Sequence, residues 1–402
     1  MIAVHRLALC GALAGALVAG FQVAQAQEIK LGAIVPSSGP FAEWGRSNTV
    51  TLNMLEKQIN DAGGINGAKL KLVILDDAAK PAQAANDLRK LAGDDQVLAV
   101  AGPLTSSACE VTFPVANQMK IVSTSQASSK PGVAKANRPW AFRNTVDEGI
   151  LANSSVPYFK KTFNAKSVAI IYDAKDAVST AIATKIMPKI FTDSGIRVSN
   201  ADSPISFNTG DLDVSAQVTK LKSLNPDGVV IGADYSQAVT VLREMKRQGL
   251  VKPVIGGTPL ISSAILQAAP EIPIVAPATF YATMKTPKAQ KFVSELQPLL
   301  RKTSGLPKDI EPSMYDANIY EIVSMYLDAV KKAGITGKAS DLDADRTKIR
   351  DYMANLKGYE GFSGPIHFGA DGDAVKNFFI VQGQNGSWET KVTGCSASGG
   401  GC

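Results

Sequence analysis

The chain has 402 residues, of which 45% are hydrophobic and 19% are charged. This balance is typical of a globular protein with room for two domains, and it excludes an intrinsically disordered chain. A net charge of +6, scattered along the sequence, is too weak to indicate a nucleic-acid-binding protein.

The N-terminus has the pattern of an export signal. His5 and Arg6 precede an apolar stretch over 7–23, and the small residues "AQA" at 24–26 fit a cleavage site. A membrane anchor fits less well, because the stretch is rich in Gly and Ala and barely long enough to span a bilayer. A lipoprotein anchor at Cys10 fits least. The sequence therefore predicts a signal peptide over 1–26 and a periplasmic protein. No later stretch has about 20 consecutive apolar residues, so no further membrane segment is expected.

Strands and helices alternate through the next 220 residues or so. The run "EIKLGAIVP" (28–36) predicts a strand, and the apolar spacing after it predicts a helix that the glycines of "DAGGINGA" end. The same pair recurs with strands at "KLKLVILDD", "VLAVAG", "SVAIIYDA" and "DGVVIGAD". Such alternation is typical of an α/β fold in which helices cover both faces of a parallel sheet.

Two changes of pattern divide the chain. The series breaks near "AFRNTVDEG" (141–149), which predicts two α/β lobes. Three helices are then expected at 287–302, 312–333 and 342–356, before strands return with "NFFIVQGQ", "SWETKV" and a hairpin turn at "GADGDAV" (369–375). The chain is therefore expected to pass between the lobes more than once.

Three loops rich in hydroxyl groups follow predicted strands. They are "VPSSGPFAEWG" (35–45), "GPLTSSACE" (102–110) and "IVSTSQASS" (121–129). Because ligands of open α/β sheets bind beyond the carboxyl ends of the strands, these loops are expected to meet at one site. Ser106 and Ser107 begin a helix, where hydroxyls and free N–H groups suit a carboxylate. Plain N-capping explains any one loop alone, whereas the three together favour a binding site.

The residue inventory argues against catalysis. Beyond the predicted signal peptide the only histidine is His367, which argues against Ser-His-Asp hydrolysis and His-based zinc sites. No phosphate-binding loop and no nucleophile with a neighbouring base are found, so the sequence predicts no enzyme, no cofactor and no metal. Cys109 is expected to be a half-buried free thiol. Cys395 and Cys402 flank "SASGGG" and could close a small terminal loop.

Several of these segments together resemble one family. "IKLGAIVPSSGPFAEWG", "INDAGGINGAKLKLVILDD", "AVAGPLTSSA", "FRNTVDEG" and "GDLDVSAQVTKLKSLNPDGVVIGAD" closely resemble the periplasmic solute-binding proteins of branched-chain amino acid (Leu/Ile/Val-binding) type ABC importers. The resemblance implies a two-lobed type I periplasmic binding fold with three crossovers between the lobes, closing on a small ligand like a hinge. It also implies a monomer that delivers its cargo to a membrane permease and its ATPase.

The resemblance sets expected lobes and ligand contacts. The N-terminal lobe is expected to comprise 27–144 and 283–357, the C-terminal lobe 145–282 and 358–394, and a flexible tail 395–402. Arg143 is expected to tie the hinge strand to its neighbours. The residues implied to hold the ligand carboxylate are Ser106, Ser107, Ser125, Gln126 and Ala127; Phe41 and Trp44 would wall the pocket, and closure would bring Asp234, Tyr235 and Thr258 over the ligand.

The second lobe departs from the amino-acid binders of this family. Where those generally place a tyrosine and an acidic residue that hold the ammonium group, this chain has Ala177 and Thr258. A buried ammonium group without a counter-charge costs several kcal/mol, so we expect an aromatic carboxylate such as a benzoate or phenylpropenoid acid. Asp176 and Asp234 supply a counter-charge if the correspondence shifts by a residue or two. Amino acid or amide binding is therefore the alternative, together with a ligand-sensing module for a separate receptor.

Overall fold

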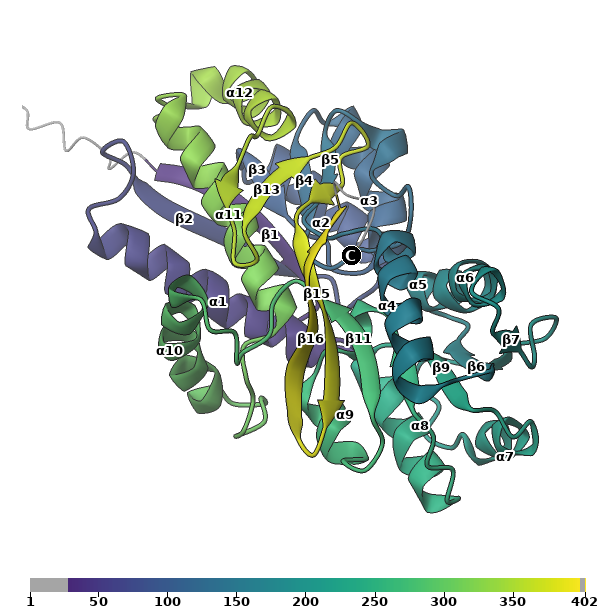
Figure 1. The fold of residues 1–402 in the computed structure, drawn as a ribbon. Coiled ribbons are helices and arrows are strands. Elements are labelled where there is room, and N and C mark those ends of the chain that lie inside the picture. The colour runs from purple at the N-terminus through teal and green to yellow at the C-terminus, as the bar shows by residue number, and fades with distance from the viewer. Residues whose placement is uncertain (1–27, 398–401) are drawn as a thin grey trace, which may run out of the picture.

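The computed structural model describes residues 28–397 and 402. The chain forms two α/β units, here called layers, each of which is a β-sheet with helices on both faces. Crossing segments join the two layers (Figure 1). The predicted signal peptide over 1–26 lies outside these residues. Within 28–397, no helix combines the length and the apolar character that a membrane span requires.

The first layer is a five-stranded parallel sheet in the order β2-β1-β3-β4-β5. Its strands are β1 (Glu28–Val35), β2 (Lys69–Asp76), β3 (Ala99–Ala101), β4 (Val122–Ser125) and β5 (Ala141–Arg143). Its helices are α1 (Ala42–Asp61), α2 (Pro81–Gly93), α3 (Ser106–Gln118), α11 (Met314–Lys332) and α12 (Leu342–Ala354). Apolar side chains of α1, α11 and α12 pack on one face of the sheet, and those of α2 and α3 pack on the other. Burial on both faces explains the nearly unbroken apolar runs of these strands.

The second layer is an eight-stranded sheet that is parallel except at one edge. Its strands are β6 (Ser167–Asp173), β7 (Arg197–Val198), β8 (Ile205–Phe207), β9 (Gly228–Gly232), β10 (Val254–Gly256), β11 (Ile274–Ala278), β15 (Asn377–Gln384) and β16 (Ser387–Ser396). One face carries α4 (Glu148–Phe163), α5 (Ala177–Ala181), the π-helical turn η2 (Ile182–Ile186) and α6 (Met187–Asp193). The other carries α7 (Ser215–Ser223), α8 (Tyr235–Arg247) and α9 (Ser263–Ala268).

The remaining elements of residues 28–397 are one helix, three short strands and three 3-10 turns. They are α10 (Pro287–Lys302), the short strands β12 (Tyr359–Glu360), β13 (Pro365–Phe368) and β14 (Ala374–Val375), and the 3-10 turns η1 (Lys135–Asn137), η3 (Thr258–Leu260) and η4 (Ala339–Asp341). The predicted helix 287–302 and the predicted hairpin turn at 369–375 are both confirmed. The chain leaves the first layer after β5, returns after β11 and leaves it again after β14.

The short strands β12, β13 and β14 form a small antiparallel sheet, and its packing bears on the predicted lobe boundaries. Ile366, Phe368 and Ala374 pack into the hydrophobic cluster of the first layer, although the predicted C-terminal lobe includes them. We therefore propose that the first lobe extends through β14, and that the second lobe resumes at β15.

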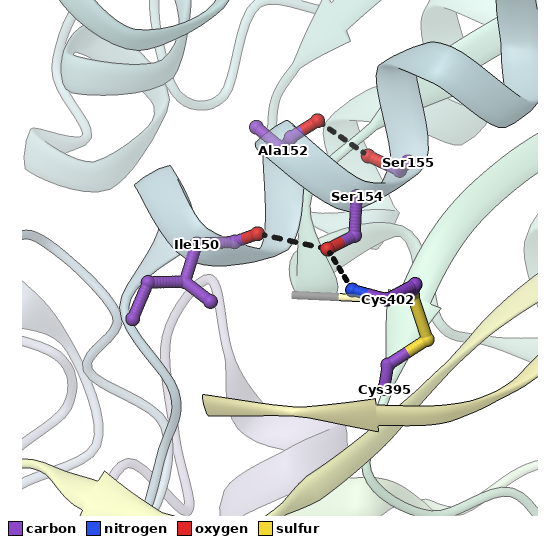
Figure 2. The surroundings of a disulfide bond; sticks show 6 residues. All are labelled: Ile150, Ala152, Ser154, Ser155, Cys395 and Cys402. Carbon is purple, nitrogen blue, oxygen red and sulfur yellow. Dashed lines mark hydrogen bonds between the residues drawn. A yellow bond between two sulfur atoms is a disulfide. The ribbon is translucent and has the colours of Figure 1, made fainter. Parts of the chain in front are cut away.

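The chain end is fastened to the second layer by a disulfide. Cys395 of β16 is bonded to Cys402, and the Cys402 N–H donates to the Ser154 hydroxyl of α4 over 3.2 Å (Figure 2). Cys109, expected to be half-buried, is instead fully buried on α3, because its thiol points at the Pro103 carbonyl inside the first lobe. Burial raises the pKa of the Cys109 thiol to about 12, which keeps it protonated and unreactive.

A buried ion pair sits where the crossing segments meet. Lys376, between β14 and β15, lies 2.9 Å from Glu321 of α11, and both side chains are almost completely buried. The Lys376 ammonium also donates to Asn318 (2.9 Å) and Asn144 (3.3 Å), while Glu321 accepts from the Phe362 N–H (2.7 Å). Each charge is thus surrounded by partners from different segments. Nearby, Arg143 is fully buried and ion-paired with Asp373 and Asp147, as expected for a residue that ties the hinge strand.

We predict that Lys376→Met destabilises the protein by about 3–5 kcal/mol, because it leaves the Glu321 carboxylate buried without its ion-pair partner. Urea unfolding followed by circular dichroism measures the change. Lys391→Met is the matched control, since the Lys391–Glu389 pair is exposed and is expected to contribute no more than about 1 kcal/mol. A Lys376→Met variant as stable as this control would contradict the prediction.

Candidate ligand-binding site

The first wall of the candidate site is built at the carboxyl ends of β3 and β4. Gly102 follows β3 with a φ of +114°, and a Cβ there would lie 2.3 Å from the Ile34 carbonyl oxygen. Glycine therefore lets the chain turn tightly into α3. Thr105 caps this helix by accepting from the Ala108 N–H (3.2 Å), so Ser106 and Ser107 are its first two residues. Among the described residues, their N–H groups find no acceptor, as expected for the first turn of a helix.

Aromatic rings from three helices close the site. Trp44 at the start of α1 lies 4.5 Å, between ring centroids, from Tyr315 of α11 and 4.6 Å from Tyr235 of α8. Phe41 stacks on Trp44 at 5.8 Å. Gly45 allows α1 to begin here, since a Cβ would lie 2.1 Å from the Pro36 carbonyl group. Because Trp44 belongs to the first lobe and Tyr235 to the second, the two lobes touch across the site.

The second lobe contributes two buried carboxylates. Asp176 follows β6 and caps α5, accepting from the Ser179 N–H (2.8 Å) and hydroxyl (2.6 Å). Asp234 follows the neighbouring strand β9 and caps α8 through its Oδ1, which accepts from the Ser236 N–H (2.7 Å). The Asp234 Oδ2 is buried and has no hydrogen-bond partner among the described residues. Adjacent strand ends thus bring two acidic side chains to one edge.

Burial sets the proton affinity of these acids. It raises the pKa of Asp234 to about 6, and the negative charge of Asp176 adds to the effect. Burial also raises the pKa of Asp176, against the hydrogen bonds from Ser179 that lower it. The pair therefore favours either a bound proton or a nearby cation.

Several of these residues line one cavity between the lobes. Its first-lobe lining is Phe41, Trp44, Leu104, Thr105, Ser106, Ala127 and Tyr315. Its second-lobe lining is Asp176, Val178, Asp234 and Pro259. The cavity is therefore apolar over most of its wall, with hydroxyl groups on one side and carboxylates on the other.

The predicted contacts divide into two groups. Phe41, Trp44, Ser106, Ala127 and Asp234 line the cavity. The predicted residues that do not line it are Ser107, Ser125, Gln126, Ala177, Tyr235 and Thr258.

Most residues of the second group support the lining. Ser125 donates to the Pro103 carbonyl (2.7 Å), and the Gln126 amide donates to Asn48 (3.2 Å), so both hold the loops of the first lobe. Tyr235 packs on Trp44, and Ser107 is only partly buried on α3. Thr258 donates to Glu148, through its hydroxyl at 2.6 Å and its N–H at 3.1 Å.

The cavity lining favours the alternative in which the second lobe keeps a counter-charge. Asp176 and Pro259 line the cavity, whereas their neighbours Ala177 and Thr258 do not. Asp176 caps the helix that Ala177 begins, which turns the carboxylate rather than Ala177 toward this edge. Tyr315 went unnoticed because its spacing on α11 is that of an ordinary core residue.

The chain matches the periplasmic binding protein family over residues 28–387. It belongs to that family. The family is non-catalytic, which confirms the prediction of no enzyme, and the α/β fold with two mostly parallel sheets is the predicted one. Among residues 28–397, no group of three or more His, Cys, Asp or Glu side chains is placed to hold a metal ion.

This binding protein is similar to proteins named as binding amino acids or other small solutes. The leucine-, isoleucine-, valine-, threonine- and alanine-binding protein of Pseudomonas aeruginosa is 27% identical over 372 residues, covering 92% of this chain and 93% of its own. A branched-chain amino acid transporter substrate-binding protein from Streptococcus pneumoniae, solved with isoleucine, has 26% identity and a TM-score of 0.77, covering 90% and 98%. An ABC transporter solute-binding protein from Rhodopseudomonas palustris, solved with benzoate, has 19% identity and a TM-score of 0.78, covering 92% and 96%. This chain is therefore similar in fold to solute-binding proteins of ABC transporters.

We predict that Asp234→Asn stabilises the ligand-free binding protein at pH 7.5 by on the order of 2–3 kcal/mol. A carboxyl group whose pKa is raised by folding stabilises the fold below its unfolded pKa near 3.8, and this contribution is lost as the pH rises through about 6. Asparagine stays neutral and still caps α8. Thermal unfolding at pH 5 and pH 7.5 measures the effect.

Asp227→Asn is a control that is expected to change the stability in the opposite direction. Hydrogen bonds from the Lys166 and Ser167 N–H groups lower the pKa of the exposed Asp227, so its neutral replacement is expected to lower the melting temperature at pH 7.5. If Asp234→Asn also lowers the melting temperature, burial of the ionised Asp234 carboxylate does not destabilise the folded protein.

Proposed function

We propose that this protein binds an α-amino acid in the cavity between its lobes. The observation that carries the proposal is the buried Asp234 Oδ2 without a partner, beside Asp176 and opposite the start of α3. An ammonium group supplies the donors and the positive charge that these carboxylates lack. The Ser106 hydroxyl and the free first-turn N–H groups of α3 suit the α-carboxylate. The apolar wall of Phe41, Trp44 and Tyr315 accommodates the side chain.

The ligands named for similar proteins agree with this assignment. The P. aeruginosa relative is a binder of aliphatic amino acids and threonine, and the S. pneumoniae structure holds isoleucine. We propose in addition that residues 1–26 direct export, and that the mature protein works in the periplasm as a monomer. By hinge closure it would carry its ligand to a permease and its ATPase.

An aromatic carboxylate is the second candidate. The benzoate complex of the R. palustris protein and the aromatic lining of Phe41, Trp44 and Tyr315 favour it. Such a ligand would bind only while Asp234 is protonated, because the ligand carboxylate and an ionised Asp234 repel each other in a closed cavity. The two candidates therefore differ in their pH dependence.

We predict that leucine and other α-amino acids bind with micromolar or tighter affinity, and that 4-hydroxybenzoate and 4-coumarate do not. Amino-acid binding should weaken as the pH falls through about 6, because protonation removes the Asp234 charge. Calorimetric titration of protein that has been unfolded, freed of co-purified ligand and refolded measures both effects between pH 5 and pH 7.5. Binding of an aromatic acid that strengthens at acid pH would replace the amino-acid assignment.

Paired serine variants test the carboxylate end. Ser106→Ala is expected to weaken binding by about 1–3 kcal/mol, because it removes a hydroxyl that hydrogen-bonds a charged group. Ser107→Ala, one residue along the same helix but outside the cavity lining, is expected to leave the affinity unchanged. Equal losses in the two variants would mean that α3 does not present Ser106 to the ligand.

A further inference from the structure

A second, outer pocket adjoins the ligand cavity. Both pockets are lined by Asp176, so they lie next to each other. Lys130 and Pro131, between β4 and β5, form its first-lobe side. The second lobe supplies Ala174, Lys175, Ala177 and further residues of α5 and η2 up to Ile186. Because each lobe provides one side, this pocket is complete only when the lobes are together.

The outer pocket carries positive charge. Three lysines line it: Lys130, Lys175 and Lys185. Lys130 is ion-paired with Glu110, whereas Lys175 and Lys185 form no ion pair with any residue that the structure describes. The only acid in the lining, Asp176, is engaged by Ser179. Two exposed ammonium groups therefore remain available to an anion.

The local backbone is unusual at the same place. Lys185 and Ile186 belong to the π-helical turn η2, which interrupts the helical segment between α5 and α6. Such turns insert an extra residue at a cost in helix geometry and occur frequently at functional sites. Here the turn contributes a lysine and an apolar side chain to the pocket wall.

We infer that the outer pocket binds a distal anionic group of the ligand, so that the cargo is an α-amino acid with a negatively charged side chain. This inference rests on the proposed function. The apolar part of the side chain would pack on the wall of Phe41, Trp44 and Tyr315, and its distal end would extend past Asp176, which lines both pockets. Lys175 and Lys185 would then meet the distal charge. The ligands named for the P. aeruginosa relative have no such charge, so the inference assigns this chain a ligand of a different class.

Nearly isosteric ligand pairs test the inference. L-glutamate is compared with L-glutamine, and L-2-aminoadipate with L-homoglutamine, its side-chain amide, by calorimetric titration of the full mature chain at pH 7.5. We expect the charged member of at least one pair to bind about 3- to 30-fold more tightly, from two partly solvated ion pairs. The ratio should fall as salt is added, because the lysines are exposed.

Charge-removal variants assign the preference to the outer pocket. Lys175→Gln/Lys185→Gln is expected to bring the ratio within each pair close to one while leaving L-glutamine binding unchanged. The matched control, Lys189→Gln/Lys220→Gln, removes two lysines from α6 and α7 outside the pocket and should preserve the ratio.

The outcomes separate the two proposals. Binding of L-leucine or L-glutamine with no preference for the charged partner overturns the outer-pocket inference and leaves the proposed function intact. A preference that the control variant reduces as much as the pocket variant overturns it as well, since general attraction then explains it. Failure of every amino acid to bind overturns the proposed function, and this inference with it.

Discussion

The buried Lys376–Glu321 ion pair is the interaction on which the arrangement of the lobes depends. Two charges out of water are tolerated only when their remaining hydrogen-bonding groups are satisfied. Here the partners are Asn318 of α11, Asn144 after β5 and the Phe362 N–H between β12 and β13. Displacing any one of these segments would take a partner from a charge deep in the protein. The segments that leave the first layer after β5 and after β14 are thereby held against α11.

The site uses this geometry by dividing its chemistry between the lobes. The first lobe presents hydroxyl and N–H groups at the start of α3, and the second presents the carboxylates of Asp176 and Asp234 at the ends of neighbouring strands. Neither lobe alone complements a zwitterion. An amino acid that satisfies both sides can do so only where the lobes meet, which couples recognition to closure.

Sequence reasoning located the strands, the helices and the edge of the first sheet where ligands bind, because apolar periodicity and loops at strand ends follow from local rules. The family resemblance then singled out Phe41, Trp44, Ser106 and Ala127 in these loops, and all four line the cavity. The second lobe was harder to predict, because the consecutive residues Asp176 and Ala177 have different roles. Asp176 caps a helix and Ala177 begins it. That choice depends on capping geometry and not on composition. Tyr315 reaches the site only through the return of the chain after β11, which no local pattern indicates.

The unpartnered Asp234 Oδ2 has a consequence for the transport cycle. Closing the lobes over this oxygen without a cation would strip it of water and give nothing in return, so the empty closed form is raised in free energy relative to the open one. A receptor built in this way rarely keeps an empty cleft closed. The carboxylate would then act as a sensor of occupancy, coupling closure of the lobes to the presence of a ligand.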